Sequence, residues 1–361
     1  MLEPDTMPLC NRAILSIILS VSTVSLGAQQ AAKPGAAPPR SQAPDLTLDR
    51  DPVRSPDSEK APTASGQPLS KEGEGYVLRT DVEEVILNAT VLAGTQLVQN
   101  LKKDNFQVFE DGVKQNILSF QHSDLPVSIA FVIDNSGSMS KKRPSVNKSA
   151  IDLVEASNSE DEAFVVNFSD EAYIDQDFTS NISKLREGLS HIESRGGTAL
   201  YDAVVASADK LVADARRPKQ VLVIITDGED NASTLTLDQT IRRVQELSGP
   251  VIYTIGLLFG DEMSRAEVRH ARRALELLSN ETGGIAFFPK SIEQVDEIAA
   301  EVARDIRSQY TIGYHSTKPT SEPGFRRVQV TAEGDGMGKL TVRTRTGYFP
   351  ATRMKKASVK K

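Results

Sequence analysis

Five residues with oxygen-bearing side chains occur in three loops that flank apolar or helical segments. Asp134, Ser136 and Ser138 alternate along the loop after one apolar run, so one carboxylate and two hydroxyls can converge on one point. Thr198 ends an Arg-Gly-Gly-Thr segment before a helical pattern, and Asp227 follows another apolar run within Thr-Asp-Gly. The sequence therefore predicts that three loops together supply a cluster of hard oxygen atoms.

Such oxygens suit Mg²⁺ in an octahedral site, with Mn²⁺ or Ca²⁺ as alternatives. If the neutral hydroxyls bind the metal directly and the two aspartates act partly through water, the ion keeps an unsatisfied positive charge. An Asp or Glu side chain of a protein partner can then complete the coordination. No histidine or spare base lies in these motifs, so the pattern favours a protein-binding site over a hydrolase active site.

Residues 126–308 alternate between apolar runs and helical patterns. The apolar runs occupy 127–133, 163–168, 221–225, 251–257 and 285–288, and the helical patterns occupy 146–156, 182–192, 199–215, 237–247, 265–279 and 292–306. Runs without a polar face are typical of strands that helices cover on both sides, as in a mainly parallel sheet. We expect a doubly wound, Rossmann-like α/β domain with its ligand site at the carboxyl edge of the sheet.

The segments on either side of this domain, 76–125 and 309–350, have the period of two that is typical of strands. Asp111 and Gly112 lie between two such runs and predict a tight hairpin turn. Neither segment has enough strands to be stable alone. We expect the two to pair into one small antiparallel β-sandwich with the α/β domain inserted between them. Two separate β appendages packed on the α/β domain are the alternative.

The three motifs together resemble the von Willebrand factor type A domain with its metal-ion-dependent adhesion site. The resemblance covers 126–308 and matches all five ligand positions, Asp134, Ser136, Ser138, Thr198 and Asp227. The phrase from Gly196 to Ala203 is also similar to bacterial members. The resemblance implies divalent-metal-dependent binding of a protein ligand, with helix movements coupled to metal coordination in some relatives.

The N-terminal part of the chain predicts export. An apolar run that ends in small residues indicates a signal peptide over 1–28, and a start at Met7 would remove the acidic Glu3 and Asp5 from it. An uncleaved N-terminal anchor is the alternative, and a membrane partner is expected only in that case. Residues 29–75, rich in Pro and Ala, predict a disordered tether, and 351–361 a solvated basic tail. The expected location is the periplasm, the cell envelope or the extracellular space, as for exported bacterial proteins of this kind.

Composition excludes several classes of function. The 42 basic and 49 acidic residues give a net charge of −7 without a basic stripe, which argues against nucleic acid as a partner. The one cysteine, Cys10, lies before the apolar run and would leave with the signal peptide. A nucleophile elbow is missing, so we expect no enzyme. The remaining alternatives are a structural envelope protein with a stabilising metal and, less favoured, a metal-assisted hydrolase.

Three further acids lie near the motifs. Asp202 is at helical distance from Thr198, and a structural role at the first turn of that helix is expected for it. Contact with the water ligands of the metal is the alternative. Glu229 and Asp230, beside Asp227, are expected to form a solvated rim.

Overall fold

A computed structural model describes the residues from 84 onward, with four short internal gaps. The described ranges are 84–155, 158–190, 194–247, 249–259 and 263–350. The predicted signal peptide (1–28), the tether (29–75), the first residues of the first β segment (76–83) and the basic tail (351–361) lie outside them. No helix in the described ranges is both long and apolar enough to cross a membrane.

A six-stranded sheet forms the centre of the α/β domain, in the order β11-β10-β9-β6-β7-β8. Its strands are β6 (Val127–Asp134), β7 (Glu162–Phe168), β8 (Ala172–Thr179), β9 (Lys219–Thr226), β10 (Val251–Gly256) and β11 (Ala286–Phe287). All neighbouring strands are parallel except β7 and β8. The prediction of a mainly parallel α/β sheet is thereby confirmed.

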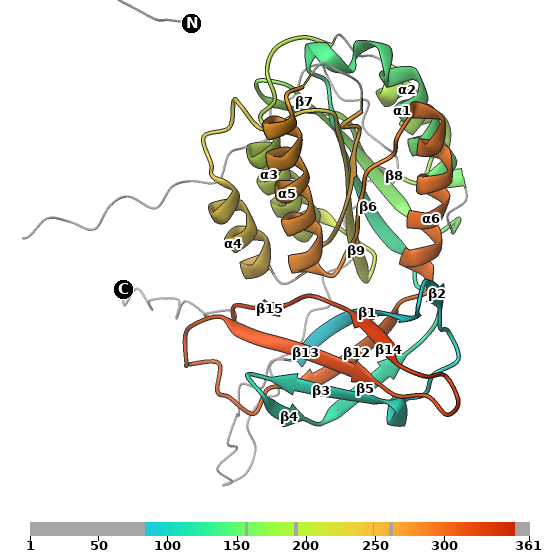
Figure 1. Cartoon of the computed structure of the whole chain (residues 1–361), viewed down its shortest axis with the longest axis vertical. Helices are drawn as coiled ribbons and strands as arrows, with labels where there is room; N and C mark the ends of the chain where they lie inside the picture. The colour runs from blue at the N-terminus through green and yellow to red at the C-terminus, as the bar shows by residue number, and fades with distance from the viewer. Residues whose placement is uncertain (1–83, 156–157, 191–193, 248, 260–262, 351–361) are drawn as a thin grey trace, which may run out of the picture. The chain divides into compact units, whose positions relative to one another are not determined.

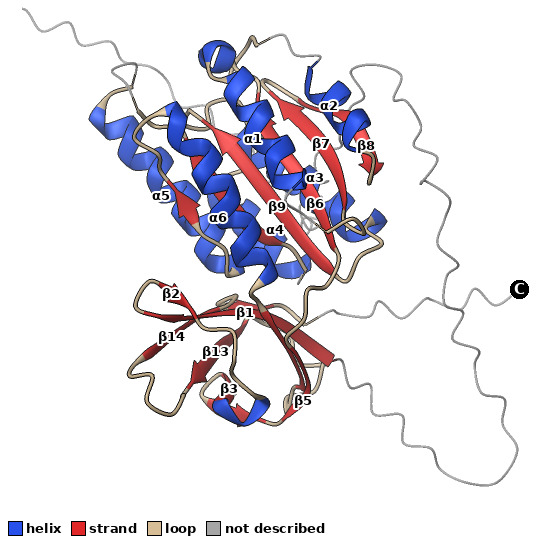
Figure 2. Cartoon of the chain, turned by 90° about the vertical axis from the view of Figure 1, so that its right-hand side faces the viewer, coloured by secondary structure: helices blue, strands red, loops and turns tan. Residues whose placement is uncertain are grey.

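Helices cover both faces of this sheet (Figures 1 and 2). They are α1 (Arg143–Glu155), α2 (Ile182–Ser190), α3 (Leu200–Asp214), α4 (Leu237–Leu247), α5 (Arg265–Thr282) and α6 (Val295–Arg307), with short 3-10 helices η2 (Gly137–Lys141) and η3 (Ile292–Gln294). Successive side chains of a strand point to opposite faces. Phe131 and Ile133 of β6 pack with α1, α2 and α6, whereas Ala130 and Val132 pack with α3, α4 and α5.

One strand of this sheet was not predicted. β8 has the sequence Ala-Tyr-Ile-Asp-Gln-Asp-Phe-Thr, in which Asp175 and Asp177 interrupt the apolar residues. It runs antiparallel at the edge of the sheet, where one side of the strand has no neighbour. An edge strand tolerates acidic residues that a central strand would not.

The two flanking segments form antiparallel sheets in which their strands pair with one another. The strands are β1 (Glu84–Ala93), β2 (Gln96–Leu97), β3 (Phe106–Glu110), β4 (Val113–Gln115), β5 (Ile117–Gln121), β12 (Tyr310–His315), β13 (Arg326–Ala332), β14 (Leu340–Arg343) and β15 (Gly347–Tyr348), with a 3-10 helix η1 (Lys103–Asn105) before β3. One sheet has the order β14-β1-β12-β5 and the other β15-β13-β3-β4. Strand β1 pairs with β12, and β3 with β13.

Both sheets contribute to one apolar cluster. It includes Leu87 of β1, Val108 of β3, Ile312 of β12 and Val330 of β13. The predicted hairpin is also present, because β3 and β4 pair on either side of Asp111 (φ 47°) and Gly112 (φ 81°). Positive φ at both positions is the geometry that a two-residue hairpin turn requires.

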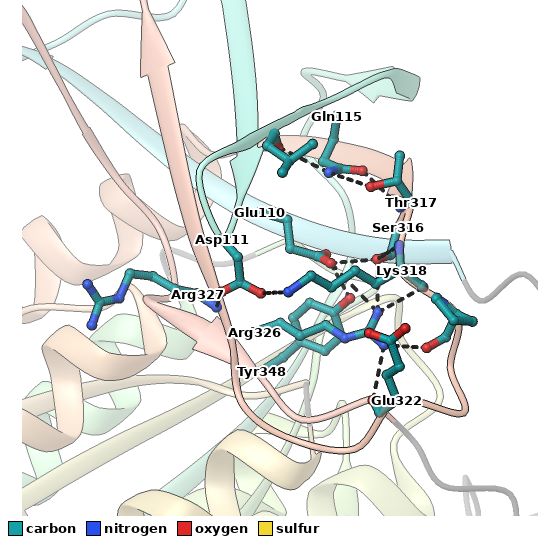
Figure 3. Close-up of polar contacts among 12 residues, drawn as sticks. Glu110, Asp111, Gln115, Ser316, Thr317, Lys318, Glu322, Arg326, Arg327 and Tyr348 are labelled. Carbon is teal, nitrogen blue, oxygen red and sulfur yellow. Dashed lines mark hydrogen bonds and ion pairs between the residues drawn. The ribbon is translucent and has the colours of Figure 1, made fainter.

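A buried polar cluster fixes the loop between β12 and β13 (Figure 3). The fully buried Glu110 carboxylate accepts hydrogen bonds from the Tyr314 hydroxyl at 2.7 Å and the Tyr348 hydroxyl at 2.9 Å. Arg326 Nη1 lies 3.6 Å from Glu110 Oε1. The Arg326 guanidinium also donates hydrogen bonds to the carbonyl oxygens of Lys318, Pro319 and Glu322. Burial raises the pKa of Tyr348, and the charge of Glu110 raises it further.

Candidate metal centre

The two predicted aspartates leave neighbouring parallel strands at the same edge of the sheet. Asp134 is the last residue of β6, and Asp227 follows Thr226, the last residue of β9. The two strands are in register as far as Ile133 and Ile225. The carboxyl ends of adjacent strands therefore bring the two carboxylates together, as the sequence predicts.

Asp134 is fully buried and tightly held. Its Oδ1 accepts a hydrogen bond from the Ser136 backbone N–H at 2.8 Å, and its Oδ2 accepts one from the Thr226 hydroxyl at 2.6 Å. Burial raises the pKa of the Asp134 carboxyl, and the nearby charge of Asp227 raises it further. A negative charge in such surroundings is costly unless a cation or hydrogen-bond donors compensate it.

The two serine hydroxyls connect the first loop to Asp227. Ser136 Oγ lies 3.1 Å from Ser138 Oγ, and Ser138 Oγ donates to Asp227 Oδ1 at 2.8 Å. Ser136 is 4% exposed, as is Asp227. Four of the five predicted ligands thus form one continuous polar cluster.

Thr198 lies next to this cluster. A Cβ added to Gly228 would be 3.5 Å from Thr198 Oγ1, which places the hydroxyl beside the loop that carries Asp227. The Asn231 side chain accepts a hydrogen bond from the Thr198 backbone N–H at 2.9 Å. That bond ties the loop of Thr198 to the loop after β9.

The two glycines before Thr198 allow the close approach of Asp170. Gly196 has φ +80°, and a Cβ on it would lie 2.3 Å from Asp170 Oδ2. The Gly197 backbone N–H donates to Asp170 Oδ1 at 2.7 Å. A side chain at Gly196 would therefore be strained at this φ and would displace the Asp170 carboxylate, which favours glycine at this position.

The further acids near the motifs are mostly structural. Asp202 has the structural role expected of it, because its carboxylate accepts hydrogen bonds from the backbone N–H groups of Thr234 and Leu235. The expectation of a solvated rim is wrong for Asp230, which is half-buried and accepts from Tyr201 N at 3.0 Å. Burial raises the pKa of Asp230.

A lysine that the sequence did not single out contacts Asp227. The Lys142 ammonium donates to Asp227 Oδ2 at 2.6 Å, and the two side chains are 15% and 0% exposed. The same ammonium lies 5.5 Å from the centroid of the Phe259 ring. Both Asp227 oxygens are therefore engaged, one by Ser138 and one by Lys142.

The next residue, Arg143, supports the loop from behind. Its buried guanidinium donates to the Asp134 carbonyl oxygen at 3.2 Å and to Asn167 Oδ1 at 2.9 Å. Burial lowers the pKa of Arg143 to about 10, although the charges of Asp175 and Asp134 oppose that shift. Two consecutive cations thus face the two aspartates.

One signal in the sequence could have revealed these cations. Lys141 and Lys142 immediately precede α1 and Arg143 is its first residue, at the helix end where the helix dipole favours acidic residues. Basic residues at that end of a helix indicate a contact with an acidic group elsewhere in the fold.

The donor set fits a hard divalent cation. It offers two buried carboxylates and three hydroxyls, all of them oxygen ligands of the kind that Mg²⁺ and Ca²⁺ take. Within the described ranges, no group of three or more His, Cys, Asp or Glu side chains is placed to hold a metal ion. A metal at this edge of the sheet would therefore depend on the serine and threonine hydroxyls.

Comparison with known proteins shows what the α/β domain is similar to. Residues 129–229 match the family model of the von Willebrand factor type A domain. These residues of the α/β domain are therefore similar to the von Willebrand factor type A family. Among curated proteins, the chain is 25% identical over 234 residues to inter-alpha-trypsin inhibitor heavy chain H4 from Homo sapiens. That match covers 60% of this chain and only 24% of the human protein.

Two solved structures align with more than half of this chain at low sequence identity. A von Willebrand factor type A protein from Catenulispora acidiphila covers 68% of this chain and 73% of its own, with 14% identity and a TM-score of 0.43. Proximal thread matrix protein 1 from mussel byssus, solved with zinc in its adhesion-site motif, covers 55% and 50%, with 19% identity and a TM-score of 0.43.

Proposed function

We propose that this protein is a divalent-metal-dependent protein-binding module. The observation that carries the proposal is the polar cluster of Asp134, Ser136, Ser138 and Asp227 across the ends of two neighbouring strands. With Thr198 beside it, this cluster would hold the metal, with Mg²⁺ preferred and Mn²⁺ or Ca²⁺ as alternatives. The type A family match supports the same assignment.

A bound metal would supply a site for an acidic side chain of the partner. Neighbouring residues hold the two carboxylates in place for the metal. Thr226 and the Ser136 backbone hold the Asp134 carboxylate, and Ser138 holds Asp227. Because three of the five ligands are neutral hydroxyls, the ion would keep part of its positive charge for a partner carboxylate. We assign the site no catalytic step.

The rest of the chain would present this site outside the cell membrane. We propose that the type A domain is inserted in a β-sandwich formed by the two flanking segments, which the pairing of β1 with β12 and β3 with β13 supports. The apolar N-terminal run would export the protein, and residues 29–75 would act as the tether.

Calorimetric titration with Mg²⁺, Mn²⁺ and Ca²⁺ tests the metal site. We expect saturable binding that Asp134→Ala abolishes. Asp152→Ala is the matched control, since this exposed aspartate of α1 pairs with Lys148 and does not contact the cluster. If Asp134→Ala, shown by circular dichroism to be folded, binds metal as well as the parent, the assignment of the site is wrong.

Affinity capture from an envelope extract tests the binding function. A partner should be retained in Mg²⁺, released by EDTA and lost in Asp227→Ala. If EDTA lowers the melting temperature of the protein but releases no partner, the metal has a structural role only.

A further inference from the structure

We propose that Lys142 is a tethered cation that competes with the divalent metal for Asp227, and so sets the metal affinity of the site. The inference rests on the proposed metal-binding function and names a residue outside the five proposed ligands. It follows from the position and burial of the Lys142 ammonium group and from the hydrogen bond that holds the Lys142 backbone.

The Lys142 ammonium and the Asp227 carboxylate form a largely desolvated pair. Their closest atoms, Nζ and Oδ2, are 2.6 Å apart, and the Asp227 side chain is fully buried. Removing one partner from such a pair leaves an uncompensated buried charge, which is strongly unfavourable. Lys142 therefore stabilises Asp227 in protein that has no metal.

An ammonium and a divalent cation that share one carboxylate repel each other. The repulsion applies whether the carboxylate binds the ion directly or through a water molecule, because both arrangements place two positive charges within a few ångströms in a partly buried site. Metal binding must therefore move the Lys142 ammonium away from Asp227 or proceed against its charge.

The Lys142 side chain can move without any change of its backbone. The residue follows η2 in a helical conformation (φ −88°, ψ −27°), and its backbone N–H donates to the Met139 carbonyl at 2.8 Å. Its flexible side chain, by contrast, is 15% exposed and has solvent within reach. The geometry suits an ammonium that swings out while the loop of Ser136 and Ser138 stays in place.

The alternative is a permanent ion pair that remains when metal binds. In that case Lys142 would position Asp227 for the metal, and its removal would weaken metal binding. The two accounts predict opposite changes in affinity for the same substitution.

Calorimetric titration of the full chain with Mg²⁺ separates them. We expect Lys142→Met to bind Mg²⁺ about tenfold more tightly than the parent or better, since one hydrogen bond to a charged group is removed from the competing state. Lys142→Arg keeps the charge and should stay close to the parent. Lys141→Met is the matched control, because Lys141 is exposed and one residue away.

A second measurement does not depend on metal affinity. In EDTA, Lys142→Met should melt at a lower temperature than the parent and than Lys141→Met, and Mg²⁺ should raise its melting temperature more. If Lys142→Met does not fold in EDTA, Lys142→Gln, which keeps a hydrogen-bond donor, replaces it.

Each outcome decides a different point. If the parent binds Mg²⁺ but Lys142→Met binds it equally or more weakly, competition by Lys142 is refuted while the metal site stands. If neither the parent nor any Lys142 variant binds metal, the proposed function fails and the inference fails with it.

Discussion

Thr226→Val is the most direct test of how the fold prepares the metal site. Thr226 is fully buried at the end of β9, where its hydroxyl donates to Asp134 Oδ2 at 2.6 Å and accepts from the Gly228 backbone N–H at 3.3 Å. Valine keeps the branched shape and the strand preference of threonine. The substitution therefore removes one hydroxyl that joins the two aspartate-bearing loops and changes little else.

The magnitude follows from the burial of Asp134. A hydrogen bond to a charged group contributes about 1.5–3 kcal/mol, so without metal the free energy of unfolding should fall by about 2 kcal/mol. Loss of an outer partner of a metal ligand typically lowers metal affinity about 10- to 100-fold. Because ligand binding stabilises the folded state, the deficit of Thr226→Val should grow to about 3–5 kcal/mol when Mg²⁺ saturates the parent.

The assay is urea denaturation of both proteins in EDTA and in excess Mg²⁺, with calorimetric titration alongside. Thr254→Val is the matched control. Thr254 is fully buried in the neighbouring strand β10, where its hydroxyl lies 3.1 Å from Ser279 Oγ and away from the aspartates. The free energy of unfolding of Thr254→Val should be about 1 kcal/mol lower than that of the parent, equally with and without metal.

One result would refute this reasoning. If Thr226→Val binds Mg²⁺ with the affinity of the parent and its deficit is the same in EDTA and in Mg²⁺, then Asp134 does not depend on Thr226 to act as a ligand.

Three further substitutions probe other parts of the molecule. Glu110→Ala should lower the free energy of unfolding by about 3–5 kcal/mol in urea, because it removes the carboxylate beside the buried Arg326 and the acceptor of the Tyr314 and Tyr348 hydroxyls. Lys219, 2% exposed, has its pKa lowered to about 8 by burial, so its charged form destabilises the fold below that pH and the cost disappears as the pH rises toward the ordinary lysine pKa. Relative to Lys219→Met, the parent should therefore gain about 2 kcal/mol between about pH 7.5 and 10. Asp170→Ala should weaken Mg²⁺ binding about threefold to tenfold in calorimetry, because it removes the acceptor of the Gly197 N–H and so loosens the loop that positions Thr198. It should lower the free energy of unfolding by about 1 kcal/mol or less.

Each of these three predictions has an outcome that would contradict it. A loss below about 1 kcal/mol in Glu110→Ala would mean that the buried cluster contributes little. Parallel pH profiles for the parent and Lys219→Met would show that Lys219 keeps an ordinary pKa. Asp170→Asn keeps an acceptor for Gly197 and should bind metal like the parent. Equal weakening in both Asp170 variants would contradict the positioning role.

Much of the α/β domain could be predicted because its strands are buried on both faces. Such strands require nearly continuous apolar sequence, and β6, β7, β9 and β10 all have it. The edge strand β8 does not, since Asp175 and Asp177 can reach solvent there. Secondary structure is predicted from the period of buried apolar residues, so a strand with few buried apolar residues is not detected.

The site was predictable to a different extent. Loops at the ends of parallel strands meet at one edge, which is why Asp134 and Asp227 could be placed together from their positions alone. The pairing of Lys142 with Asp227 depends on how the start of α1 packs against the end of β9, and the sequence does not specify that contact. Asp230 was misjudged for the same reason, because the hydrogen bond that it accepts from the Tyr201 backbone N–H joins the loop after β9 to the start of α3, 29 positions earlier in the chain.

The way β5 and β12 pair has a consequence for the independence of the flanking sheets. Gln121, the last residue of β5, is the direct partner of Thr311 near the start of β12, although 189 positions separate them in the numbering. Opposed residues in antiparallel strands lie about 5 Å apart, so a short turn could join these strands directly. The whole stretch between them could therefore be replaced by a short turn without breaking any strand pair of the two flanking antiparallel sheets.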